Sequence, residues 1–272
     1  MPFVERGDIR LFYEQRGQGP RLLVITGTNG DLRRKPSVLE SPLAKRFTLL
    51  AYDQRGLGQS SKPDRPYRMA DYADDAAHVM EAVGWERARV LGISFGGMVA
   101  QEFALRHPRK VERLALACTA PGGRGGASYP LHELIGLSPQ QRAEHLLAIQ
   151  DTRRDAAWVA ADPARARAAL DELMARARPV DPSDPNVALG ARRQLEARRD
   201  HDTFDRLPQL KMPVGLFAGK YDGVAKPEAQ EAMRRQIPQA SLRFFEGGHL
   251  FTIQDPTAYP AIADFLAGQQ QD

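Results

Sequence analysis

The stretch Gly92-Ile93-Ser94-Phe95-Gly96-Gly97 decides how this chain is interpreted. It follows the apolar run Arg89-Val90-Leu91 and precedes a helical pattern from Met98 to Arg106. A Gly-x-Ser-x-Gly between a strand and a helix is typical of a nucleophile elbow, which lifts one serine hydroxyl above a sheet. Flanking glycines are expected because the serine backbone is strained and neighbouring side chains would collide. The pattern predicts Ser94 as a nucleophile, with a helix N-cap serine as the structural alternative.

Length and composition indicate one large α/β domain with an inserted subdomain. The chain has 272 residues, of which 42% are hydrophobic and 26% charged, enough to bury a sizeable core. No apolar run approaches the roughly 20 residues that span a bilayer, and the first six residues lack the regions of a signal peptide. We therefore expect a cytoplasmic protein without a membrane partner. The single Cys118 lies in an apolar run and is expected to be a buried small hydrophobe.

Charge and motifs favour a small-molecule partner. The net charge is +4, but basic and acidic residues alternate and no aromatic-studded basic tract occurs, so nucleic acid is not an expected partner. No spacing typical of metal ligands is present, Ser94 stands where a dinucleotide fingerprint needs glycine, and no P-loop lysine follows. We therefore expect neither a metal nor a cofactor. Homo-oligomerisation is left open.

Apolar runs alternate with helical patterns along most of the chain. Such alternation predicts a mostly parallel sheet covered by helices on both faces. The expected strands are Ile9 to Gln15, Arg21 to Thr26, Phe47 to Tyr52, Arg89 to Ile93, Val111 to Ala117, Val214 to Ala218 and Ala240 to Phe245. The expected helices are Met69 to Val83, Met98 to Arg106, Pro227 to Gln236 and Pro256 to Ala267, the last with Asp255 as its N-cap.

Residues 121–206 interrupt this alternation. They open with the flexible Pro121-Gly122-Gly123-Arg124-Gly125-Gly126 and continue as helical sequence rich in alanine and arginine, broken by prolines. We interpret them as a helical lid over the carboxyl ends of the strands, where α/β proteins build their sites. The predicted division is a core of residues 1–120 and 207–272 with an insertion of residues 121–206.

A serine nucleophile needs a histidine to accept its proton and an acid to orient that histidine. In elbow-type sites the acid and the histidine follow the serine in that order. Asp222 follows the expected strand Val214 to Ala218, and His249 follows the expected strand Ala240 to Phe245. Their alternatives are a turn aspartate and an exposed loop histidine. Because both leave carboxyl ends of strands in one sheet, we expect Asp222 and His249 to converge on Ser94.

With these residues in place, the chain resembles the α/β-hydrolase superfamily. Asp53-Gln54-Arg55-Gly56-Leu57-Gly58-Gln59-Ser60 is similar to the Asp-x-Arg-Gly-x-Gly-x-Ser loop of that family. The closest likeness is to bacterial esterases and lactonases of the 3-oxoadipate enol-lactonase kind, which carry a similar Gly-Gly-Met-Val-Ala-Gln after the nucleophile. The resemblance implies an α/β-hydrolase fold with an inserted helical lid. It also implies that Asp53 and Arg55 pack beside the site without a chemical role.

The same resemblance implies two oxyanion-hole donors, the amides of Phe95 and Thr28. The chain departs from the family here, because Thr26-Gly27 stands where His-Gly is common. The change removes a side chain that helps to hold the loop but removes neither N–H. The alternative is that the loop from Thr26 to Gly30 forms only a tight turn.

The predicted function is a serine hydrolase of carboxylic esters or lactones that forms an acyl-enzyme at Ser94. Alternatives on the same fold are a C–C bond hydrolase, a cofactor-free perhydrolase and a ligand-binding protein with slow turnover. Trp158 and Met174 are expected to line the substrate site, with packing of the lid as their alternative role. A solvated helical face is the expected role of the lid arginines Arg153, Arg154, Arg192, Arg193, Arg198 and Arg199.

Overall fold

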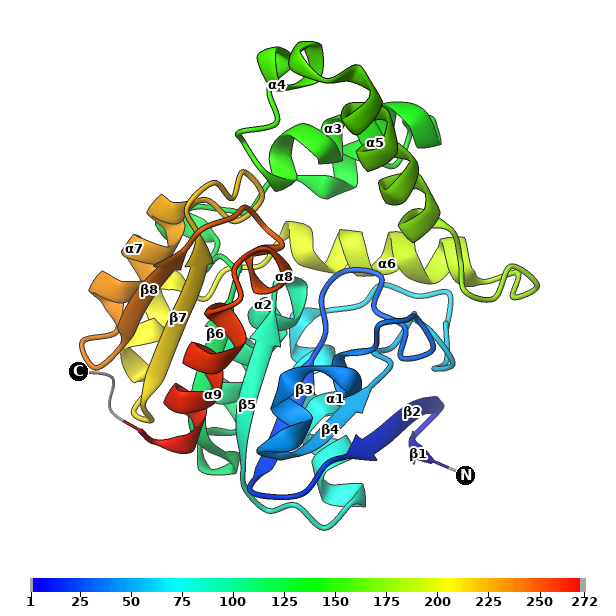
Figure 1. Cartoon of the computed structure of the whole chain (residues 1–272). Helices are drawn as coiled ribbons and strands as arrows, with labels where there is room; N and C mark the ends of the chain where they lie inside the picture. The colour runs from blue at the N-terminus through cyan, green and yellow to red at the C-terminus, as the bar shows by residue number, and fades with distance from the viewer. Residues whose placement is uncertain (1, 270–272) are drawn as a thin grey trace.

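A computed structural model, describing residues 2–269, shows an eight-stranded sheet at the centre of the molecule (Figure 1). Its spatial order is β1-β2-β4-β3-β5-β6-β7-β8, and all neighbouring strands from β4 to β8 are parallel. β1 and β2 extend one edge in antiparallel pairing. The strands are β1 (Phe3–Arg6), β2 (Ile9–Arg16), β3 (Arg21–Ile25), β4 (Thr48–Tyr52), β5 (Ala88–Ile93), β6 (Val111–Ala117), β7 (Val214–Gly219) and β8 (Ser241–Phe245).

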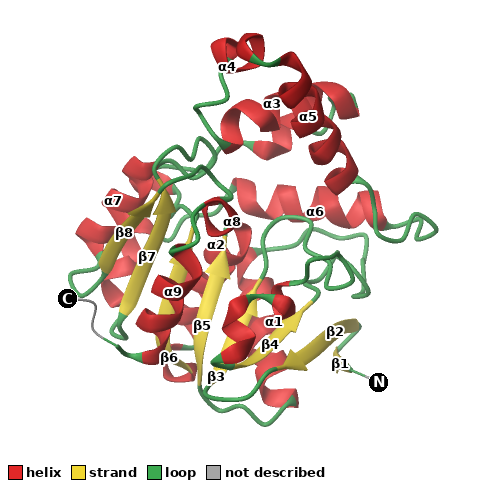
Figure 2. Cartoon of the chain, viewed as in Figure 1, coloured by secondary structure: helices red, strands yellow, loops and turns green. Residues whose placement is uncertain are grey.

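Helices cover both faces of the sheet (Figure 2), which confirms the predicted fold class. The central strands are apolar on both sides, as doubly covered parallel strands must be. One core contains Tyr72, Phe103 and Met233 and lies under α1 (Met69–Ala82), α2 (Phe95–Arg106) and α7 (Pro227–Gln236). The other contains Leu43 and Ile262 and lies under η2 (Pro42–Lys45), η1 (Val38–Glu40) and α9 (Ala258–Ala267). Cys118 is buried in this second core, as expected.

Several elements differ from the sequence predictions. The helix after Ser94, α2, begins at Phe95 rather than Met98, and the short helix α8 (Phe251–Gln254) was not predicted. The edge strand β1 was not predicted, since its four residues are mostly half-buried and carry no clear alternation. The last helix begins at Ala258 rather than Pro256, and its N-cap is Thr257 rather than Asp255. The Asp255 carboxylate instead accepts hydrogen bonds from the Thr257 amide and from the amide of Glu246. Asp255 therefore organises the turn before the helix, an ordinary role for aspartate.

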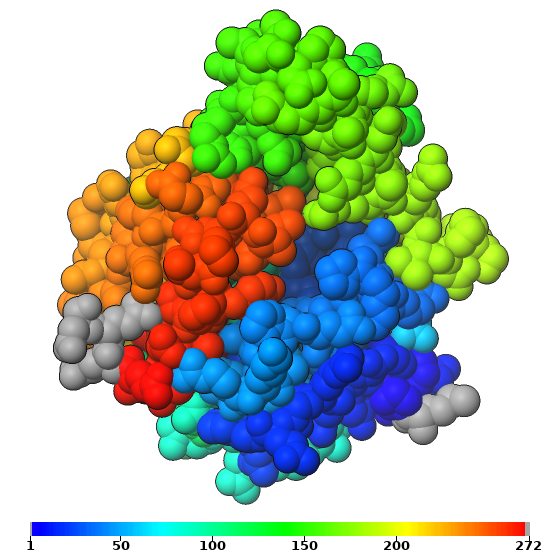
Figure 3. Space-filling view, viewed as in Figure 1, coloured from blue at the N-terminus to red at the C-terminus, as the bar shows by residue number. Residues whose placement is uncertain are grey.

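The span between β6 and β7 is helical and, apart from one isolated bridge, contains no β pairing in the described structure. Its α-helices are α3 (Pro139–Gln150), α4 (Ala156–Ala161), α5 (Pro163–Ala177) and α6 (Val187–Arg199). α6 lies across the carboxyl ends of the strands, and α3, α4 and α5 lie beyond it (Figure 1). In Figure 3 the surface is hollowed between this insertion and the N-terminal segments drawn in blue. The division into core and lid at residues 121 and 206 remains a prediction.

Across residues 2–269, none of the helices combines the length and the apolar character needed to cross a bilayer.

Candidate active site

Ser94 occupies the turn between β5 and α2 in a strained backbone conformation. Its φ is 55° and its ψ is −117°, a region that non-glycine residues enter only under constraint. The constraint is visible: the Ser94 amide donates to the carbonyl of Ala117 at 2.8 Å. The Ser94 side chain makes no capping hydrogen bond to α2. The structural alternative of a helix N-cap therefore does not describe this serine, and its hydroxyl is free for another partner.

The glycines around Ser94 are required by close backbone approaches. A Cβ atom at Gly96 would overlap the carbonyl oxygen of Ile25 in β3, and one at Gly92 would crowd the carbonyl oxygen of Gly96. Gly97 packs against Thr119 in the same way. The turn is thus held tightly between two neighbouring strands, and this packing fixes the direction of the serine hydroxyl.

The structure brings the three residues of the predicted triad together. His249 Nε2 lies 2.9 Å from Ser94 Oγ, and His249 Nδ1 lies 2.8 Å from Asp222 Oδ2. Asp222 is 2% exposed, and its other oxygen accepts hydrogen bonds from the amides of Val224 and Ala225 at 2.8 and 2.9 Å. The carboxylate is therefore fixed by the loop that follows β7, and only one of its oxygens is directed at the imidazole.

The loops that carry the acid and the histidine are bonded to the end of α3. The His249 amide donates to the carbonyl of Gln150 at 2.6 Å, and the Gly223 amide donates to the carbonyl of Ile149 at 2.9 Å. Gly248 packs directly on this segment, since a Cβ there would overlap the Gln150 carbonyl oxygen. These contacts could not be predicted from local patterns, because they join residues far apart in the sequence.

The loop after β3 lies beside the nucleophile. A Cβ atom at Gly27 would lie 4.0 Å from Ser94 Oγ. Neither the Thr28 amide nor the Phe95 amide has a hydrogen-bond acceptor within residues 2–269. Both N–H groups that the family resemblance implies as oxyanion donors are therefore unoccupied near Ser94. Thr28 Oγ1 is likewise buried without a partner.

Two glutamines hold this loop where many family members have a histidine. Gln54 Nε2 donates to the carbonyl of Thr26 at 2.8 Å, and Gln194 Oε1 accepts from the amide of Asn29 at 2.9 Å. Gln194 belongs to α6 and is fully buried. Sequence reasoning missed both residues. The only local signal for Gln194 is that it lies four positions after Gly190, on one face of an otherwise charged helix.

The Asp53 to Ser60 loop is structural, as the resemblance implies. Asp53 is buried and accepts hydrogen bonds from the amides of Leu32 and Gln59, both at 2.8 Å. Burial raises the pKa of this carboxyl to about 6. Arg55 forms a buried ion pair with Asp75, with Nε–Oδ2 at 2.6 Å. These bonds shape the loops beside Ser94 without reaching it.

Trp158 and Met174, predicted to line the substrate site, make no hydrogen bond or ring contact with the triad in the described residues. Trp158 lies on α4, which Figure 1 places at the far end of the insertion, and the Arg165 guanidinium lies 4.3 Å from the centre of its ring. Met174 is half-buried on α5. Their substrate role remains a prediction. Within residues 2–269 no group of three histidine, cysteine or carboxylate side chains could hold a metal ion.

Comparison with known proteins places this site in a family. The sequence model of the alpha/beta hydrolase fold matches residues 20–256. A poly(3-hydroxyalkanoate) depolymerase of Ectopseudomonas oleovorans is 26% identical over 92% of this chain and 85% of its own.

Two solved structures superpose with a TM-score of 0.77. One is an enol-lactonase from Burkholderia xenovorans, at 24% identity over 98% of this chain and 100% of that chain. The other is a hydrolase from Pseudomonas aeruginosa, at 26% identity over 98% and 97%. Together with the family match, they show that the chain belongs to the alpha/beta hydrolase fold family and is related to hydrolases.

Proposed function

We propose that this hydrolase acts on carboxylic esters or lactones through an acyl-enzyme at Ser94. The observation that carries the proposal is the continuous hydrogen-bonded chain from Asp222 through His249 to Ser94 Oγ. Such a chain gives a hydroxyl a base that can accept its proton during attack on a carbonyl. The relative named as a poly(3-hydroxyalkanoate) depolymerase supports an acyl substrate.

Each residue then has a definite step. Ser94 Oγ attacks the carbonyl carbon while His249 Nε2 takes its proton and passes it to the leaving alcohol. Asp222 keeps the Nδ1 proton in place and stabilises the imidazolium. The amides of Phe95 and Thr28 stabilise the oxyanion, where removing one such donor typically costs about 3–4 kcal/mol. Water activated by His249 then releases the acid, and no cofactor takes part.

We further propose that the helical insertion serves as a lid. Its support is that α6 crosses the strand ends and contacts the Thr26 to Gly30 loop through Gln194. In α/β folds this edge of the sheet is where substrates bind.

The test is turnover and acylation by a panel of simple esters and lactones. The intact protein should release product and show a transient mass increase on the peptide that contains Ser94. Ser94→Ala should lower kcat by roughly 10³-fold or more while leaving the melting temperature unchanged, whereas the control Ser241→Ala, at an exposed strand position, should retain full activity. Normal rates in Ser94→Ala would refute the proposal. Adding a diketone and a peracid assay to the panel tests the two alternative chemistries directly.

A further inference from the structure

Among the six lid arginines expected to form a solvated helical face, Arg198 has surroundings unlike those of the others. Arg153 pairs with Asp151, and Arg193 pairs with Asp64. Arg198 is only 7% exposed, and no carboxylate of the described residues pairs with it. A buried charge without a counter-ion is unfavourable, and such groups in proteins are usually paired or functional. The expectation of a solvated helical face is therefore wrong for Arg198.

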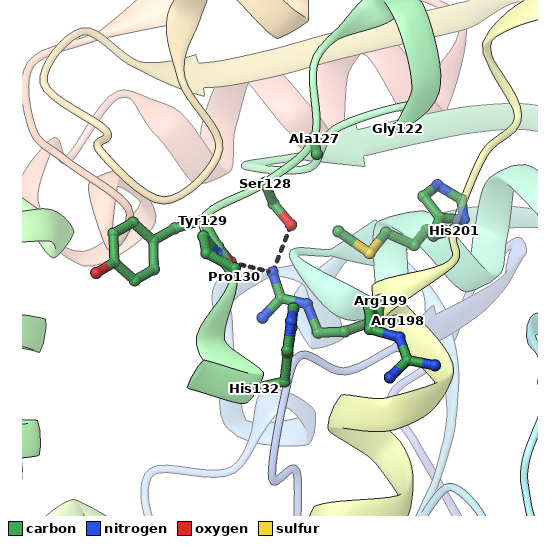
Figure 4. A pocket seen from close by; sticks show the side chains of 10 residues that line it. Gly122, Ala127, Ser128, Tyr129, Pro130, His132, Arg198, Arg199 and His201 are labelled. Carbon is green, nitrogen blue, oxygen red and sulfur yellow. Dashed lines mark hydrogen bonds between the residues drawn. The ribbon is translucent and has the colours of Figure 1, made fainter. Parts of the chain in front are cut away.

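The Arg198 guanidinium is only partly satisfied by the protein. Its Nη2 donates to the hydroxyl of Ser128 and to the carbonyl of Tyr129, the latter at 3.1 Å (Figure 4). Its Nη1 is buried and has no hydrogen-bond partner. Burial lowers the pKa of Arg198 to about 10, so the side chain remains charged at neutral pH. One N–H edge of a buried cation is thus left without an acceptor.

Arg198 is among the residues that line a cavity of about 80 Å³, large enough for a carboxylate and several waters. Nδ1 of His132 also lines the cavity and is buried without a partner. The imidazole of His201 is buried there too and adds no negative charge. No aspartate or glutamate is among the lining residues, which are Met98, Gly122, Ala127, Ser128, Tyr129, Pro130, His132, Arg198, Arg199 and His201. The chemistry of this cavity therefore suits an anion.

The path of α6 connects the loop beside the nucleophile with this cavity. Along one face of this helix, Gly190 packs on Gly56 after β4, Gln194 bonds to Asn29 after β3, and Arg198 bonds to Ser128 beyond β6. The sheet order β4-β3-β5-β6 puts the end of β5, where Ser94 stands, between the last two contacts. Met98, in the first turns of α2, joins the cavity to the elbow.

We propose that Arg198 binds a free carboxylate of the substrate, so that the enzyme prefers esters carrying an acid group a few carbons from the scissile carbonyl. This inference rests on the proposed function of Ser94. Arginine presents a planar pair of donors that matches a carboxylate, and such charge-assisted hydrogen bonds are about twice as strong as neutral ones. The substrate carboxylate supplies the counter-ion that the protein lacks.

The first experiment compares matched methyl esters by methanol release. The charged series is monomethyl succinate, glutarate and adipate, and the neutral series is methyl butyrate, valerate and hexanoate. We expect kcat/KM to favour the best charged ester by on the order of 10- to 100-fold, mainly through KM. Arg198→Met should lower kcat/KM for the charged esters much more than for the neutral ones, so that the preference disappears. Arg192→Met, an exposed arginine of the same helix, should change neither series. Equal rates for the two series, or a parallel loss in both with Arg198→Met, would overturn the inference.

A second experiment measures binding without turnover and separates the two proposals. Calorimetry on Ser94→Ala should show monomethyl glutarate binding at least 10-fold more tightly than methyl valerate, and this difference should disappear in Ser94→Ala with Arg198→Met. Arg198→Lys retains the charge and should keep part of the difference, which checks that the loss is not a folding defect. Acylation at Ser94 without charge preference overturns the carboxylate site alone. Selective binding of the charged ester, with no acylation in the intact protein, overturns the proposed function alone.

Discussion

The two sides of Ser94 are connected to the helical insertion by different sets of hydrogen bonds. On the histidine side, backbone carbonyls at the end of α3 accept from the amides of His249 and Gly223, and the Gln254 side chain adds one bond to Asp151. On the oxyanion side, a single side chain, Gln194 of α6, accepts from Asn29. Backbone bonds survive most substitutions, whereas a side-chain bond is lost with one. The histidine side therefore depends mainly on loop shape, and the oxyanion side depends on residue identity.

Asp222→Asn should have the largest effect, because it acts on the chemistry of the histidine side without altering its shape. An asparagine side chain has one acceptor oxygen, which the two loop N–H groups occupy, so it presents its NH2 group to His249 Nδ1. It therefore cannot stabilise an imidazolium, and the tautomer with the proton on Nδ1 becomes unfavourable. We expect kcat to fall by roughly 10³- to 10⁴-fold, the scale seen when such an acid is neutralised. Steady-state kinetics on one ester, with Asp200→Asn as an exposed control, measures this. A loss below tenfold would show that Asp222 is only a turn residue.

Gly248→Ala tests the backbone connection on the same side. The added Cβ overlaps the Gln150 carbonyl oxygen, so the loop that carries His249 must move. Because a displacement of about 1 Å can cost roughly 10²-fold in rate, we expect a kcat loss of that order together with a lower melting temperature. Gly136→Ala, where a Cβ meets nothing within 4 Å, is the matched control. Unchanged kinetics in Gly248→Ala would mean that this contact does not position the histidine.

Gln194→Leu and Gln150→Ala compare the two sides directly. Gln194→Leu removes the bond to Asn29, and we expect about a tenfold loss in kcat with little change in KM. Gln150→Ala leaves the carbonyl that accepts from His249 in place, so its kcat should stay near that of the parent. A larger loss of kcat in Gln150→Ala than in Gln194→Leu would contradict this difference between the two sides.

The smallest effect concerns stability in acid, near the end of α6. Burial lowers the pKa of His201 to about 4, below the value near 6.5 in an unfolded chain. Between these values only the unfolded chain binds the proton. The stability that the neutral, buried His201 contributes is therefore fully present above pH 6.5. As pH falls from 6.5 through about 4, the free energy of unfolding drops by about 3 kcal/mol.

Denaturant unfolding of the parent and of His201→Asn between pH 7 and pH 4 measures this contribution. Asp53 acts in the opposite direction, because its pKa is raised to about 6, so only the difference between the two proteins isolates His201. As pH falls toward 4, the free energy of unfolding of the parent should decrease relative to that of His201→Asn. A constant gap would show that His201 does not titrate with unfolding.

The sequence predicted the parts of the molecule whose signals are local. Ser94 directly follows β5, and Asp222 and His249 lie in the loops after β7 and β8. Parallel strands bring their carboxyl ends to one edge. Gln194 and Arg198 could not be identified this way, because their roles depend on how α6 crosses loops that are distant in the sequence, 165 positions away for Gln194 and 70 for Arg198. An arginine-rich helix indicates solvent exposure unless its buried face is known.

The most direct test of the central claim is reaction with a fluorophosphonate probe, followed by peptide mapping and intact mass, with heat-denatured protein as control. The folded protein should gain one adduct per chain, located on Ser94, and the denatured protein should gain none. Labelling that is absent from a folded sample, or that falls on another serine, would contradict the assignment of Ser94 as an activated nucleophile.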